Sequence, residues 1–219
     1  MKRVAIFIDW DNFRKELEKV IANTNTKLDD FDYNNLTQLM KLIKSFINDT
    51  EEELYRIFIY TAHPLSYKDV ESELKKRNIS QNEIQLFSQN KQKIDSTFVK
   101  AKKFIDNIAL QEYVALRKGI LKIGAICNGE VTINQKQVDM LIGLDIAQLS
   151  YESRVDKIIV CSKDTDMKPA IKVARINGIH TVISKFKEIK QNIPKELREH
   201  TDTIREISFV DFVNNLKNN

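Results

Sequence analysis

Two short apolar runs that stop abruptly at polar and acidic residues constrain this chain more than any other feature. Residues 4–8 are five consecutive apolar residues followed by Asp9, and residues 158–161 are four followed by Ser-Lys-Asp. Runs of this kind are typical of strands buried on both faces of a parallel sheet. In open parallel sheets, ligands bind outside the carboxyl ends of the strands. The two runs therefore predict a parallel sheet with an acidic edge.

The remaining apolar patterns alternate between strands and amphipathic helices, which predicts an α/β fold whose mostly parallel sheet is covered on both faces. The predicted strands span residues 3–9, 53–62, 114–126, 130–133, 156–161, 179–183 and 204–208. The predicted helices span residues 12–22, 32–48, 66–77, 91–107, 138–149, 167–177, 194–200 and 209–216. We expect one domain over residues 1–219, with a basic lobe of helix and hairpin at about 80–135.

The composition excludes several classes of protein. Hydrophobic residues make up 42% of the 219 residues, enough for a sizeable core, and the scarcity of Gly (5) and Pro (3) argues against disorder. No apolar run approaches the roughly 20 residues that span a bilayer, so we expect no membrane partner. Cys127 and Cys161 have no partners at metal-binding spacing, which favours free thiols and a cytoplasmic location. No P-loop, G-x-G-x-x-G or G-x-S-x-G motif occurs.

Basic residues are concentrated rather than spread evenly. The net charge is +4, and residues 90–122 contain eight Lys or Arg against three acids. A basic segment beside an acidic edge fits a polyanion that is held by its backbone. The same lysines are equally compatible with ordinary solvated helix faces, and the charge alone leaves both interpretations open.

The acidic residues at the predicted strand ends have the chemistry of a divalent-cation site, because Mg²⁺ and Mn²⁺ prefer carboxylate and water oxygens. Each also has a structural explanation. Asn12 either caps a helix or orients Asp9, and Asp139 suits the positive end of a helix. Asp164 and Asp166 bracket Thr165, where one of them suffices for a helix cap. Asp145, within an apolar stretch, either supports the site or faces solvent.

At these residues the sequence resembles the NYN domain family, in particular its LabA-like branch, within the PIN-like nuclease superfamily. The matching stretches are FIDWDN (7–12), LRKGIL (116–121), KQVDMLIGLD (136–145), IIVCSKDTDMKPAI (158–171), NGIHTVI (177–183) and LREHTDTIREI (197–207). The resemblance implies a three-layer α/β/α fold with about five parallel strands, an acidic pocket for Mg²⁺ or Mn²⁺, and endonucleolytic activity, usually on RNA. Two positions depart from the family pattern: Lys163 replaces a glycine and Met167 a phenylalanine.

The leading hypothesis is a metal-dependent endoribonuclease in which a metal-activated water hydrolyses the phosphodiester bond. The candidate catalytic residues are Asp9, Asn12, Asp139, Asp145, Asp164 and Asp166. Four of them are the candidate metal ligands, namely Asp9, Asp139, Asp164 and Asp166. The candidate RNA contacts are Lys136, Lys163, Lys102, Lys103 and Arg117.

Two rival functions remain open at this point. One is a non-catalytic RNA-binding or regulatory module that keeps the fold, which would be favoured if Lys163 weakened metal binding. The other is a phosphatase-like hydrolase acting on small phosphate esters. The sequence leaves the type of RNA open, and a homo-oligomer is compatible with it.

Overall fold

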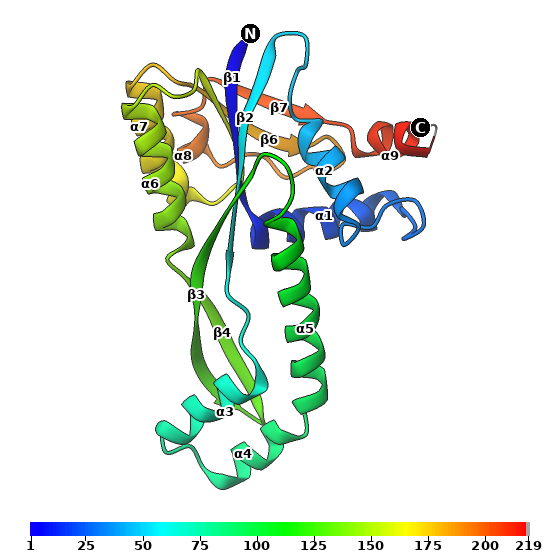
Figure 1. Ribbon diagram of the computed structural model, residues 1–219, viewed down its shortest axis with the longest axis vertical. Coiled ribbons are helices and arrows are strands. Elements are labelled where there is room, and N and C mark those ends of the chain that lie inside the picture. The colour runs from blue at the N-terminus through cyan, green and yellow to red at the C-terminus, as the bar shows by residue number, and fades with distance from the viewer. Residues whose placement is uncertain (218–219) are drawn as a thin grey trace.

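Seven strands form one sheet in the computed structural model, which describes residues 1–217 (Figure 1). The strand order is β4-β3-β2-β1-β5-β6-β7, and every neighbouring pair is parallel except β3 and β4. The strands are β1 (Lys2–Asp9), β2 (Glu52–Ala62), β3 (Val114–Cys127), β4 (Glu130–Lys136), β5 (Lys157–Cys161), β6 (His180–Phe186) and β7 (Thr203–Ile207).

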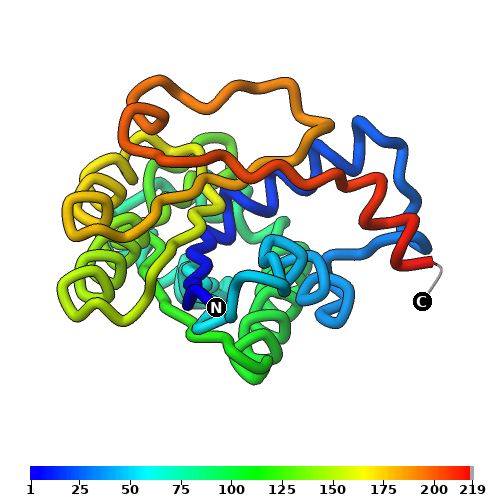
Figure 2. Tube along the Cα trace, turned by 90° about the horizontal axis from the view of Figure 1, so that it is seen from above, coloured from blue at the N-terminus to red at the C-terminus, as the bar shows by residue number. Residues whose placement is uncertain are grey.

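Helices cover both faces of this sheet. They are α1 (Trp10–Thr24), α2 (Leu36–Lys44), α3 (Tyr67–Lys76), α4 (Gln81–Ser88), α5 (Lys91–Ile108), α6 (Val138–Tyr151), α7 (Lys168–Ile176), α8 (Lys195–Arg198) and α9 (Phe209–Lys217). Seen from above, α6 and α7 lie on one side of the sheet, and α1, α2 and α9 lie on the other (Figure 2). The three-layer α/β/α class predicted from the sequence is therefore confirmed. Every helix within residues 1–217 is too short or too polar to span a bilayer.

The central strand β1 explains why its sequence is continuously apolar. Val4, Ile6 and Ile8 pack into the core shared with α1, α2 and α9, whereas Ala5 and Phe7 pack into the core shared with α6 and α7. Successive side chains of a strand point to opposite faces. Because both faces are covered, every residue from 4 to 8 must be apolar.

The sheet contains more strands than the family resemblance implied. Six strands run in parallel, rather than about five, and a seventh is antiparallel. Strand β3 changes partner along its length: its first part pairs with β2 through Gly119, while Ile120 onward pairs with β4. A Cβ atom at Gly119 would lie 2.6 Å from the carbonyl oxygen of Lys136, so the change of partner requires glycine there.

Helices α3 and α4, the outer part of α5 and the β3–β4 hairpin project from the sheet, with a small apolar core of their own (Figure 1). Tyr67, Phe87 and Ile123 are buried in this core. Helix α4, which the sequence analysis missed, supports the tip of the β3–β4 hairpin. Its Glu83 carboxylate accepts the N–H groups of Asn128 and Gly129, at 3.2 and 2.7 Å. This contact joins the hairpin to α4 at the far end of the projection.

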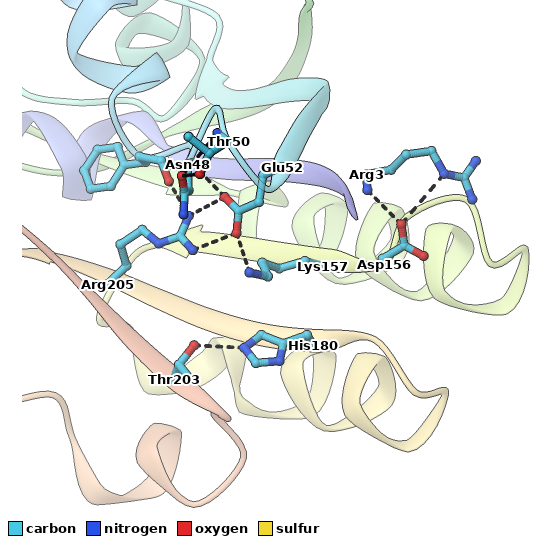
Figure 3. Close-up of polar contacts among 10 residues, drawn as sticks. Arg3, Asn48, Thr50, Glu52, Asp156, Lys157, His180, Thr203 and Arg205 are labelled. Atoms are coloured by element: carbon cyan, nitrogen blue, oxygen red, sulfur yellow. Dashed lines mark hydrogen bonds and ion pairs between the residues drawn. The ribbon is translucent and has the colours of Figure 1, made fainter. Parts of the chain in front are cut away.

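A buried carboxylate connects three strands near the amino end of the sheet (Figure 3). Glu52 on β2, only 2% exposed, accepts two hydrogen bonds from Arg205 on β7, at 2.7 and 2.8 Å, and a third contact from Lys157 on β5. The Asn48 N–H donates to the same carboxylate at 2.9 Å. Burial by itself would raise the pKa of Glu52, but these partners outweigh it and lower the pKa to about 2.

We predict that Glu52→Gln destabilises the fold in a pH-dependent way. A lowered pKa contributes stability that is present above the unfolded value of about 4.3 and is lost as the pH falls toward 2. At pH 7 the variant should lose about 3 kcal/mol of unfolding free energy, and the loss should shrink below pH 4. Urea denaturation over this pH range measures it, with the exposed neighbour Glu53→Gln as the control. An equal loss at pH 7 and pH 3 would contradict the prediction.

Candidate functional site

Asp9 is the last residue of β1 and lies at the carboxyl edge of the sheet. It is opposite Tyr60 of β2, and the preceding Ile8 is opposite Cys161 of β5. Its side chain is 3% exposed and caps α1, because Oδ1 accepts the N–H groups of Asp11 and Asn12 at 3.1 and 3.3 Å. The helix therefore starts at Trp10, two residues earlier than predicted, and the capping role falls to Asp9.

Asn12 fixes the other oxygen of the same carboxylate. Its side-chain Nδ2 donates to Asp9 Oδ2 at 2.8 Å. The backbone N–H and the side-chain amide of Asn12 thus donate to the two oxygens of Asp9, one each. Asn12, three residues further along the chain, therefore holds the Asp9 carboxylate in one orientation. This contact is the one that an orienting role for Asn12 requires.

Two further acids follow β5, the neighbour of β1 in the sheet. Asp164 caps the short 3₁₀ turn Thr165–Met167, and its Oδ1 accepts the N–H of Asp166 at 3.0 Å. Asp164 thus caps the turn, and the exposed side chain of Asp166 is not needed for capping. The fourth acid, Asp139, is exposed in the first turn of α6, which has no side-chain cap at Gln137.

The four acids influence one another electrostatically. Burial, with added repulsion from Asp139 and Asp11, raises the pKa of Asp9 to about 6 although the Asn12 hydrogen bonds oppose the shift. Although Asp139 is exposed, nearby protein atoms partly desolvate its carboxyl group, and this desolvation and the charges of Asp164 and Asp166 raise its pKa, while Lys136 acts in the opposite direction. Residues from three separate stretches of the chain therefore share one region of negative potential.

This region matches a divalent cation in donor type and in charge. Burial and, second, repulsion raise the pKa values of Asp9 and Asp139, and a bound cation would favour the charged form of both carboxyl groups. However, within residues 1–217 no three Asp, Glu, His or Cys side chains are grouped closely enough to hold a metal ion as they stand. The donor chemistry fits, whereas the assembled ligand set is not present.

Asp145, also predicted for the site, has different partners. Its Oδ2 accepts hydrogen bonds from the Tyr60 hydroxyl at 2.7 Å and from Arg117 Nε at 3.0 Å. The Arg117 guanidinium also lies 5.6 Å from the centre of the Phe58 ring. Burial and the neighbouring Asp145 raise the pKa of Tyr60, so its hydroxyl remains a donor. These contacts join α6 to β2 and β3 and assign Asp145 and Arg117 a structural task.

The predicted lysine contacts separate into different environments. Lys163 forms an ion pair with Glu16 of α1, and both side chains are largely buried. Lys136 is exposed and acts on the pKa of Asp139. Lys102 and Lys103 are exposed on α5. The partnership of Glu16 with Lys163 was not predicted, because the two residues are distant in sequence and no local pattern connects them.

The comparisons with known proteins identify the family of this chain. The NYN domain family matches residues 3–208, nearly the whole chain, so the chain belongs to that family. NYN domains are part of the PIN-like nuclease superfamily; they are generally nucleases and typically use divalent metals. A crystal structure of a protein of unknown function from Vibrio parahaemolyticus is similar, with 14% identity, a TM-score of 0.48, and coverage of 95% of this chain and 94% of that one. A comparison with curated proteins gives no match.

We predict that Asp9→Asn stabilises the metal-free protein at neutral pH. The folded state keeps the Asp9 proton to about pH 6, whereas the unfolded chain loses it near pH 4. The unfolding free energy therefore falls as the pH rises between these values, by up to about 3 kcal/mol. Asparagine keeps an acceptor oxygen for the cap and carries no charge. Urea denaturation in EDTA should show a gain at pH 7.5 that vanishes at pH 4, with the exposed Asp49→Asn as the control. A less stable variant at pH 7.5 would refute this.

We also predict that Asp145→Asn lowers stability without removing nuclease chemistry. The variant loses a charged acceptor for Arg117 and should lower the unfolding free energy by about 1–3 kcal/mol. Thermal unfolding measures this loss, and cleavage rates are then compared at a temperature at which both proteins are folded. Unchanged stability together with lost cleavage would return Asp145 to the catalytic set.

Proposed function

We propose that this NYN domain protein is a divalent-metal-dependent endoribonuclease that hydrolyses phosphodiester bonds with water. The observation that carries the proposal is the gathering of acids from β1, α6 and the segment after β5 at one edge of the sheet. Burial first, and the neighbouring acids second, raise the pKa values of Asp9 and Asp139. Negative charge accumulated at the carboxyl edge of a parallel sheet is the expected setting for a cation and a phosphate ester.

The residues take different parts in this proposal. Asp9, Asp139, Asp164 and Asp166 are the proposed ligands, and Asn12 keeps the Asp9 carboxylate in one orientation. When bound, Mg²⁺ or Mn²⁺ supplies Lewis-acid stabilisation of the phosphodiester and activates the attacking water. Lys136, whose charge already acts on Asp139, is positioned to offset phosphate charge.

The ion pairs formed by the nearby cationic side chains support a bound metal ion as the counter-charge of the acids. Lys163 is neutralised by Glu16, and Arg117 by Asp145. Neither cation therefore serves as the permanent counter-ion of the acids. The concern that Lys163 weakens metal binding is reduced by the same ion pair, because its charge is already matched within the protein.

A non-catalytic RNA-binding module is the second candidate, and one observation favours it. Asp9 and Asp164 both use carboxylate oxygens for helix capping, and no ligand set is assembled within residues 1–217. The module and the nuclease share the fold and the RNA partner but differ in the need for metal.

The deciding experiment incubates labelled RNA with the protein in EDTA, Mg²⁺ or Mn²⁺. We expect internal cleavage that requires the metal, and a loss of at least about 100-fold in Asp9→Asn and in Asp164→Asn. Asp49→Asn is the matched control, and circular dichroism confirms that each variant is folded.

Three other results would reject the proposal. Wild-type cleavage rates in Asp9→Asn with Mn²⁺ would remove Asp9 from the site. Binding of several RNAs without any cleavage would support the module. Turnover of a generic phosphate ester without RNA cleavage would support a phosphatase-like hydrolase.

A further inference from the structure

A cavity of about 830 Å³ separates α5 from the β3–β4 hairpin. Figure 1 shows the long helix on one side and the two-stranded ribbon on the other, joined through α3 and α4 at the far end. Phe98 and Phe104 line it from α5, and Leu121 and Ile133 line it from the hairpin. Its volume lies within the range of about 300–1,000 Å³ that is usual for ligand sites.

Aromatic rings line the end of this groove that is nearest to the sheet. Trp10 stacks on Phe104 with ring centroids 4.6 Å apart, and Tyr33 contacts Trp10 edge-on at 6.3 Å. Trp10, Tyr33, Phe98 and Phe104 all contribute to the lining, the last three half-buried. Partly exposed rings of this kind form a platform on which planar groups stack.

Positive charge lies along the helical wall. Helix α5 contains five lysines and two aspartates, a balance of +3, and two of the lysines, Lys93 and Lys100, line the groove. The ion pairs within residues 1–217 involve neither of them. Arg14 also lines the groove, but Glu18 at 2.6 Å and Asp11 at 3.7 Å offset its charge.

The groove begins beside the acidic edge. Trp10 and Asp11, which line it, directly follow Asp9 in the chain. Thr61 and Ala62 line it as well, and they follow Tyr60, the residue of β2 that pairs with Asp9. A chain lying in the groove would therefore pass next to Asp9 at its inner end.

We infer that this groove binds single-stranded RNA, with bases stacked on its aromatic end and phosphates beside Lys93 and Lys100. The inference rests on the proposed function, because the occupant is the substrate of the acidic edge. Stacking requires bases whose faces are free, whereas the bases of a duplex are already stacked on one another. A positive wall beside aromatic rings is the combination that single-strand-binding proteins use. The groove thus deepens the proposal by naming the type of RNA and its path.

The test measures binding without cleavage. Fluorescence anisotropy in EDTA follows a 5′-labelled oligouridylate, alone and annealed to oligoadenylate, across a salt series. We expect the single strand to bind more tightly than the duplex. Lys93→Gln/Lys100→Gln should weaken binding by about tenfold and reduce the salt slope by about 1.4, the value for two phosphate contacts to a single strand.

The comparison pair is Lys102→Gln/Lys103→Gln, which removes the same charge from the same helix at residues that do not line the groove. The sequence analysis named this pair as candidate RNA contacts, so the comparison tests the groove against that earlier expectation. This comparison pair should change binding much less. Phe98→Leu provides a second variant that keeps an apolar side chain but removes a stacking surface, and it should weaken binding without changing the salt slope. Circular dichroism confirms that each variant is folded.

Several outcomes would overturn the inference. Equal losses in the two lysine pairs would assign binding to the overall charge of α5. Tighter binding of the duplex, or no binding of either RNA, would also reject the groove as a single-strand site. Failure of the proposed function is separate: single-strand binding that depends on Lys93 and Lys100, without metal-dependent cleavage, supports the groove and rejects the nuclease. Metal-dependent cleavage that is unaffected in the groove variants supports the nuclease and rejects the groove.

Discussion

The buried carboxylate of Asp9 is the constraint on which the rest of the site depends. Its position is fixed because β1 is hydrogen-bonded to β2 on one side and β5 on the other. Three N–H donors from Asp11 and Asn12 hold its oxygens, yet burial and neighbouring acids still raise its pKa to about 6. Hydrogen bonds alone do not compensate the buried charge. The arrangement is a local instability that a cation would remove.

The two ends of the sheet differ in how the charge of a buried carboxylate is compensated. At the amino end, Glu52 is buried to the same degree as Asp9, but Arg205 and Lys157 lower its pKa to about 2. At the carboxyl end, Lys163 is paired with Glu16 instead of with Asp9. Glu52 is thus paired with cations of the protein itself, whereas the nearby cation Lys163 is not paired with Asp9. Structural ion pairs and functional sites are expected to differ in this way, since a site must leave charge for its ligand.

The sequence predicted the features that follow from local pattern and from parallel topology. The apolar run of β1 fixed its burial on both faces, and the acids at the ends of β1 and β5 are placed on one edge because parallel neighbours end together. It did not predict the pairing of Asp145 with Tyr60 and Arg117, which are 85 and 28 residues away. Such long-range side-chain contacts depend on packing between elements and leave no periodic signal. Helix α4 was missed because only Phe87 is buried along its eight residues, too few to produce an amphipathic pattern.

The groove beside α5 shows what helical periodicity cannot predict, namely which face of a helix borders a cavity. Lys93 and Lys100 are seven residues apart, about two turns of helix, and therefore share a face. Lys102 and Lys103 do not line the groove. The sequence analysis named the second pair, Lys102 and Lys103, as candidate RNA contacts. The opposing β3–β4 hairpin decides which face of α5 borders a cavity. The position of the hairpin depends in turn on the change of partner at Gly119 and on the contact of Glu83 with the hairpin tip. The face of a basic helix that borders a cavity is thus set by the elements that are packed around the helix.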